Sequence, residues 1–137
     1  MLNVPSWITH NEILNKEING KTALMYSITY KMKKVALELL KKKDINYNEI
    51  DDFGYSALMY SILANIYEVS LELLKKKDID YNLKDYYGYT ILMFSILKKN
   101  KKITLELLKK KDIDYNSVST DGDTALILSC KKFNIKK

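Results

Sequence analysis

The chain has 137 residues, 47% of them hydrophobic, which is typical of one globular domain and excludes a disordered chain. One proline and four glycines are too few for an all-β fold, and the single cysteine, Cys130, excludes an intrachain disulfide and a thiolate metal cluster. The formal net charge of +6 comes from 23 lysines without any arginine, and the codon bias of an AT-rich genome explains much of it without an anionic partner.

The N-terminal residues MLNVPSWITHNEIL contain no basic segment followed by an apolar run, and nowhere do eighteen apolar residues follow one another. We therefore expect neither a secretory signal nor a transmembrane helix. The use of one cysteine also fits a reducing compartment. These features favour a cytoplasmic protein, which would act in the cytosol of a host cell if its source is a virus or another pathogen.

Residues 1–19 are predicted to form an N-terminal capping segment. Thr9 and Glu12 have the spacing of a capping box, and Ile8 and Ile13 are placed as a hydrophobic staple. This pattern predicts a short helix over about residues 10–16. Trp7 is expected to pack against the first repeat; the alternative is an exposed anchor for a partner.

From residue 20 onward the chain repeats itself every 34 residues, a period marked by Gly20, Gly54, Gly88 and Gly122. The segments that begin at these glycines read GKTALMYSI, GYSALMYSI, GYTILMFSI and GDTALILSC. Self-similarity at this period is the signature of a stacked repeat architecture. We predict three complete repeats, 20–53, 54–87 and 88–121, followed by half a repeat, 122–137.

The first segment of each repeat is predicted to be a helix. A hydroxyl residue precedes each one and is placed to accept a backbone N–H of the first turn: Thr22, Ser56, Thr90 and Thr124. Leu58, Met59 and Ile62 illustrate the apolar spacing that recurs in every repeat and buries one stripe of a helix.

The second segment recurs as VALELLKKKDINYN, VSLELLKKKDIDYN and ITLELLKKKDIDYN, and its leucines predict a second helix with Glu72 facing water. Lysines 75–77 close that helix, where cations favour the negative end of the helix dipole. A β-like stretch from Ile79 to Asn82 is then expected to lead to a turn at Tyr87 and Gly88.

These units resemble ankyrin repeats, whose signature is a T-P-L-H-x-A helix start, a leucine-rich second helix, and a finger that ends in Asn before an Asp-x-x-Gly turn. The turn is matched by residues 51–54 and 85–88, and the finger asparagine by Asn48, Asn82 and Asn116. The resemblance covers about residues 20–133. It implies an all-α solenoid of helix–turn–helix repeats with β-like finger loops.

The chain departs from the family pattern in three ways. The proline of the helix start is replaced by Ala or Ile and the histidine by Met or Ile, which removes a hydrogen-bond network of the family. The period of 34 exceeds the usual 33 by one residue, which falls between the two helices near Lys31, Asn65 and Lys99. Aspartates stand where the family has a helix-ending glycine: Asp44, Asp78 and Asp112.

The fourth unit stops early, because Lys137 stands where its second helix would begin. A terminal repeat needs a polar outer face, which four lysines would supply: Lys131, Lys132, Lys136 and Lys137. The alternative is that this unit is a truncated piece of a longer array.

No constellation of catalytic residues is expected. His10 is the only histidine, and Ser27, Ser61, Ser95 and Ser129 occupy one repeated position that is typical of helix packing. Cys130 aligns with Ile28, Ile62 and Ile96, so we expect a small buried side chain rather than a reactive thiol. We therefore expect no enzyme, no cofactor and no metal site.

Within the family, the fingers and the inner helices line a concave face that binds partner proteins, and the resemblance implies the same use here. The aligned positions on that face hold the residues that we expect to contact a protein partner: Phe53, Tyr55, Tyr86, Tyr87, Tyr89, Leu63, Leu97 and Tyr30. The alternative for the finger tyrosines is packing on the next repeat. We expect replacement of Tyr87 and Tyr89 by Ala to weaken partner binding without unfolding the protein. Other aromatic residues are assigned structural roles: Tyr47, Tyr81, Tyr115, Tyr26, Tyr60 and Phe94.

Two other functions compete with the binding of a protein partner. The lysine ridges 41–43, 75–77 and 109–111 could bind nucleic acid or an anionic membrane through phosphate contacts. The absence of arginine and the dipole role of these lysines favour a solvated face instead. The other function is a self-assembling stack, in which the abbreviated ends associate; the expected state is a monomer or a weak homo-oligomer.

Overall fold

The computed structural model describes residues 20–132 of the chain. The predicted capping helix of residues 1–19 and the predicted packing of Trp7 lie outside the described residues. The described part contains seven α-helices and no sheet: α2 (Ala23–Thr29), α3 (Lys33–Leu40), α4 (Ala57–Leu63), α5 (Tyr67–Leu74), α6 (Ile91–Leu97), α7 (Lys101–Leu108) and α8 (Ala125–Lys132). None of these helices has the length and apolar character that crossing a bilayer requires.

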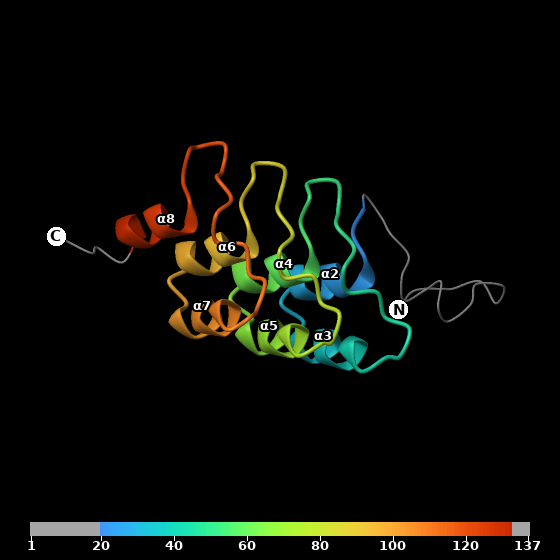
Figure 1. The fold of residues 1–137 in the computed structure, drawn as a ribbon. Helices are drawn as coiled ribbons and strands as arrows, with labels where there is room; N and C mark the ends of the chain where they lie inside the picture. The colour runs from blue at the N-terminus through green and yellow to red at the C-terminus, as the bar shows by residue number, and fades with distance from the viewer. Residues whose placement is uncertain (1–19, 133–137) are drawn as a thin grey trace, which may run out of the picture.

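The helices form two rows, which confirms the predicted all-α repeat solenoid (Figure 1). The first helix of each repeat lies in one row, α2, α4, α6 and α8, and the second helices α3, α5 and α7 lie in the other. Finger loops project from the first row, on the side away from the second. The first helices α2, α4 and α6 each pack on the second helix of their own repeat and on the first helix of the next, and α8 packs on α6.

The predicted N-caps are confirmed. The side-chain oxygens of Thr22, Ser56 and Thr90 each accept the backbone N–H of the residue three positions on, at 3.2 Å. Thr124 does the same for Ile127, also at 3.2 Å. Because the helices have only seven or eight residues, these caps and the tertiary packing must supply stability that such short helices lack alone.

A residue in the left-handed conformation ends the first helix of each complete repeat. Lys31, Asn65 and Lys99 have φ angles of 58°, 62° and 56°, which lie in the left-handed region. At Asn65 the backbone N–H donates to Ile62 O, and the next N–H, of Ile66, donates to Ser61 O at 2.9 Å. This pair of bonds is a Schellman motif, in which the left-handed position is usually glycine.

Successive repeats are held together by the finger asparagines. Asn48 donates its side-chain N–H to the carbonyl of Asp78 and accepts the N–H of Asp80 with its side-chain oxygen, both at 2.8 Å. Asn82 repeats these two bonds one unit later, to the carbonyl of Asp112 at 2.7 Å and the N–H of Asp114 at 2.8 Å. The side chain of one repeat therefore binds the backbone that comes after the second helix of the next.

The middle lysines of the second and third ridges couple the repeats in the opposite direction. Lys76 Nζ donates to the carbonyl of Leu40, the last residue of α3, at 2.7 Å, and it lies 5.9 Å from the ring centre of Tyr47. Lys110 makes the same bond to Leu74 at 2.8 Å, with its ammonium 5.8 Å from the ring of Tyr81. A cation thus caps the negative end of the preceding repeat's helix.

The predicted β-like stretch from Ile79 to Asn82 is wrong. Its second half is a turn, and in the described part of the chain the fingers contain only isolated bridges, Ile50 to Ser56 and Lys84 to Thr90. The reason is that Asn82 and the backbone after α5 bond to neighbouring repeats rather than across a ladder.

Two further predictions fail at the C-terminal end. Cys130 is exposed, although its counterparts Ile28, Ile62 and Ile96 are buried. Tyr115 is exposed too, whereas Tyr47 and Tyr81 are half-buried beside a lysine of the next repeat. Both errors have one cause: within the described residues no second helix comes after α8, so nothing covers these positions.

The finger asparagines offer a matched test of coupling between repeats. We expect Asn82→Ala to lower the free energy of unfolding by about 1–2 kcal/mol, because two hydrogen bonds to the next repeat are lost. Asn116 is the equivalent residue of the last complete repeat, and the described chain has no following second helix for it to bind. Asn116→Ala should therefore change the free energy of unfolding by less than about 0.5 kcal/mol. Urea denaturation measures both, and equal effects would contradict this account.

The left-handed lysine offers a second test. We expect Lys99→Gly to raise the free energy of unfolding by about 0.5–1 kcal/mol, because glycine reaches φ 56° without the penalty that a β-carbon imposes. Lys101→Gly, two residues on and inside α7, is the control and should be destabilising. A destabilised Lys99→Gly protein in thermal unfolding would show that the left-handed turn is not strained.

Candidate partner-binding surface

Each finger turn is built on a buried aspartate. Asp51 Oδ1 accepts the backbone N–H groups of Phe53 and Tyr55, both at 2.9 Å. Asp85 accepts those of Tyr87 and Tyr89 with the same distances. The carboxylate thus fixes the backbone of the residues on either side of the turn glycine, and it sets the direction in which their aromatic rings leave the finger.

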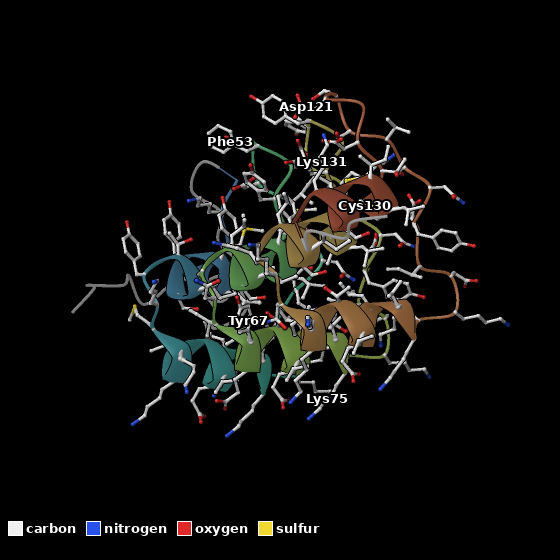
Figure 2. All side chains as sticks on the ribbon, turned by 90° about the vertical axis from the view of Figure 1, so that its left-hand side faces the viewer. Phe53, Tyr67, Lys75, Asp121, Cys130 and Lys131 are labelled. Carbon is white, nitrogen blue, oxygen red and sulfur yellow. The ribbon has the colours of Figure 1, made fainter. Side chains whose placement is uncertain are left out.

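Three of the predicted partner-binding aromatics are exposed at the tips of two neighbouring fingers. Phe53 is 62% exposed, Tyr86 66% and Tyr87 63%. Figure 2 shows Phe53 at the end of its finger, on the opposite side of the molecule from Lys75. Large aromatic side chains are more often buried than this, so their gathering on two tips is the feature that singles out this surface.

Tyr55 and Tyr89 behave differently, because both are half-buried against Phe94. The ring centres of Tyr55 and Phe94 lie 6.0 Å apart, as do those of Tyr89 and Phe94. The Tyr89 hydroxyl donates to the Asp121 carboxylate of the next finger, which raises the pKa of Tyr89 above its ordinary value. These two residues support the fingers, so replacing Tyr89 by Ala would remove packing as well as surface.

The partner-binding residues predicted on the first helices also include both exposed and half-buried side chains. Tyr30 is exposed at the end of α2, where its ring stacks on that of Tyr26 at 6.2 Å. Leu63 and Leu97 are half-buried and pack against the hydrophobic core. Tyr30 is therefore available to a partner, while the two leucines offer only part of their surface.

Lys21 is a residue of this face that the sequence analysis missed. Its ammonium lies 5.0 Å from the ring centre of Tyr60 and 5.6 Å from that of Tyr26, which is cation–π geometry. The other repeats have Tyr55, Tyr89 and Asp123 at the position of Lys21. This difference between the repeats was the feature of the sequence that could have identified Lys21 as a surface residue.

Tyr60 connects a finger to a first helix. Its hydroxyl donates to the Asp51 carboxylate, and burial raises the pKa of Tyr60 far above its ordinary value, so the proton stays on the hydroxyl. This bond joins finger and helix in a chain that lacks the family's histidine at position 59.

The lysine ridges have partners within the protein. The first lysine of each ridge pairs with the glutamate three residues before it, at 3.0–3.1 Å: Lys41 with Glu38, Lys75 with Glu72 and Lys109 with Glu106. Lys76 and Lys110 donate to backbone carbonyls. Among the described residues these contacts leave Lys42 and the third lysine of each ridge, such as Lys77, as the solvated charges, and they disfavour a dedicated phosphate-binding ridge.

Within residues 20–132 no three His, Cys, Asp or Glu side chains lie close enough together to hold a metal ion. Comparison with known proteins places the chain beside one family: a model of ankyrin repeats, comprising three copies, matches residues 4–85. No curated protein matches the chain. The third and fourth glycine-marked units lie beyond the matched residues. The third has the same two helices as the first two, and the fourth has the first of them, α8, among the described residues.

Proposed function

The chain belongs to the ankyrin-repeat family, whose members are generally protein–protein interaction modules, and we propose that it binds a partner protein on its finger tips. We call this surface the aromatic tip surface and define it by Phe53, Tyr86 and Tyr87. Tyr30, exposed at the end of α2, is proposed as a further partner contact outside this surface. The observation that carries the proposal is the exposure of three aromatic rings on two adjacent fingers.

The construction of the fingers supports this use. Because Asp51 and Asp85 each hold two backbone N–H groups, the tips are fixed before a partner arrives, and little conformational entropy remains to be lost on binding. Tyrosine and other large aromatics supply much of the contact energy in protein interfaces. A rigid turn that carries exposed rings is therefore suited to recognition.

The surroundings of the aromatic tip surface suggest the chemistry of its partner. Asp52 and Asp121 are exposed on the finger ends beside the rings, and Figure 2 shows Asp121 at the same end of the molecule as Phe53. We expect a partner with an apolar or aromatic centre and basic or hydrogen-bond-donating groups around it. We place this interaction in the cytoplasm and assign the protein no catalytic step.

A capture experiment tests the aromatic tip surface. The immobilised full chain and its Phe53→Ser, Tyr86→Ser, Tyr87→Ser variant are incubated with extract of the native cell, and the retained proteins are identified by mass spectrometry. We expect at least one protein to be retained by the wild type and lost, by about tenfold or more, from the variant, because truncated hot-spot residues cost about 2 kcal/mol or more.

The matched control replaces the solvated lysines, Lys43→Gln, Lys77→Gln and Lys111→Gln, and should retain the same protein. Circular dichroism should show equal helix content in all three proteins, since every replaced side chain is exposed. If the lysine variant loses the retained protein and the aromatic variant keeps it, the partner binds the lysine ridges and not the aromatic tip surface.

A further inference from the structure

The loops that join the first and second helices of the repeats form a side of the stack distinct from the fingers and the lysine ridges. Because the two helices of a repeat run in opposite directions, the three loops lie at one end of the helix pairs, and the ridges lie at the other (Figure 1). Figure 2 is turned toward this side and labels Tyr67 there. We call this side the loop edge and define it by residues 31–34, 65–68 and 98–102.

Two of the three loops are rich in lysine. Together the first and third loops hold seven: Lys31, Lys33, Lys34, Lys98, Lys99, Lys101 and Lys102. All are exposed except Lys98, which is half-buried. Lys33 pairs with Glu68 at 3.1 Å, and among the described residues no carboxylate forms an ion pair with the other lysines of the loop edge. The loop edge therefore presents positive charge that the described part of the protein does not neutralise.

Most of these lysines occupy positions where folding disfavours them. Residues 33–34 begin α3 and residues 101–102 begin α7, so their charges lie at the positive end of a helix dipole. Lys31 and Lys99 have φ angles of 58° and 56°, in the left-handed region that glycine prefers. The ridge lysines differ, because they stand at the negative ends of their helices. Lysines that oppose the stability of the fold indicate a use other than folding.

The second loop shows that a repeat can be built without them. Asn65 takes the left-handed position, and Tyr67 and Glu68 begin α5. The Tyr67 hydroxyl donates to Asn65 Oδ1 at 2.6 Å. Nevertheless α5 packs on both α3 and α7, as the stack requires. The loop edge is thus positive in its first and third loops, and it carries no lysine in the loop between them.

We propose that the loop edge binds an extended acidic segment of a protein, in which two groups of carboxylates are separated by uncharged residues. Packed helices lie about 8–10 Å apart, so the first and third loops are separated by about 16–20 Å. An extended chain advances about 3.3 Å per residue, so roughly five or six residues join the two acidic groups. Met32 in the first loop is 48% exposed and offers an apolar contact to such a segment.

The second loop favours a protein segment over a nucleic acid or an anionic membrane. The phosphates of a strand and the headgroups of a membrane carry charge along their whole length, so they would meet the exposed carboxylate of Glu68 and no lysine at the second loop. A peptide can place its carboxylates at its two ends alone. The loop edge does not include the aromatic tip surface, so this inference does not depend on the proposed function.

A peptide titration tests the spacing of the two lysine groups. The peptide Glu-Glu-Ser-Leu-Ser-Gly-Ser-Leu-Glu-Glu is added to the isotope-labelled full chain in about 50 mM salt, where screening is weak. We expect saturable NMR shifts of the backbone amides of residues 31–34 and 98–102. The control peptide Ser-Leu-Ser-Glu-Glu-Glu-Glu-Gly-Ser-Leu has the same composition and charge. It should bind at least about threefold more weakly, because its carboxylates reach only one group of lysines.

A loop-edge variant, Lys34→Gln, Lys101→Gln, Lys102→Gln, tests the residues themselves. It should bind the spaced peptide about three- to thirtyfold more weakly, through the loss of three exposed ion pairs. It should also unfold at a higher temperature than the wild type, because its lysines no longer oppose the helix dipoles.

The matched control is the ridge variant, Lys43→Gln, Lys77→Gln, Lys111→Gln, which removes the same charge from the opposite end of the helices. It should bind the spaced peptide within about twofold of the wild type, since distant charges are partly screened. The Phe53→Ser, Tyr86→Ser, Tyr87→Ser variant should bind the peptide normally, and its failure to do so would place the peptide on the fingers instead.

Several results would overturn the proposal. They are the absence of saturable shifts at about 1 mM peptide, equal affinity for the two peptides, and equal weakening by the loop-edge and ridge variants. A lower unfolding temperature of the loop-edge variant would give these lysines a structural role. Tighter binding of pentathymidylate, which also carries four negative charges, would assign the loop edge to nucleic acid. Sedimentation with phosphatidylserine vesicles that the loop-edge variant loses would assign it to a membrane.

Discussion

The repeats of this protein hold one another by side chains of one repeat that bind the backbone of the next. The side chains of Asn48 and Asn82 bind the turn after the second helix of the following repeat. Lys76 and Lys110 donate to the last carbonyl of the second helix of the preceding repeat. Because the receiving groups belong to the backbone, the coupling depends only on the helix and turn geometry of the neighbour. Such an array is stabilised by nearest-neighbour contacts, and its end repeats make half of them.

This coupling explains how far the sequence could predict the structure. The caps and the two helices of each complete repeat follow from local patterns that recur with the period, and both are present. The burial predicted for Cys130 and the packed position predicted for Tyr115 were inferred from the aligned residues of the earlier repeats. Such an inference assumes that the same neighbours surround each copy of the repeat. The last unit lacks those neighbours in the described residues, so burial at its positions could not be read from the repeat.

The same reasoning applies to the aromatic residues of the fingers. Tyr55, Tyr87 and Tyr89 are alike in sequence, yet Tyr87 points to solvent while Tyr55 and Tyr89 pack on Phe94. Which ring is free depends on the neighbouring finger and helix, and this information is tertiary. The division is useful to a binding module, because the packed rings and the aspartate-held turns keep the exposed rings in place. Recognition at the tips therefore depends on the stacking beneath them.

The coupling of neighbouring repeats is tested most directly by replacing two turn glycines with alanine. One glycine lies against the next finger, and the other has no finger beyond it among the described residues. Gly54 and Gly122 have φ angles of 83° and 82°, so alanine is equally strained at both. A β-carbon at Gly54 would lie 3.1 Å from the backbone nitrogen of Tyr86 in the next finger, whereas at Gly122 nothing lies within 4 Å. We expect Gly54→Ala to lower the free energy of unfolding by about 1 kcal/mol or more beyond the loss in Gly122→Ala. Equal losses in urea denaturation would contradict the close approach of successive fingers on which the stack is built.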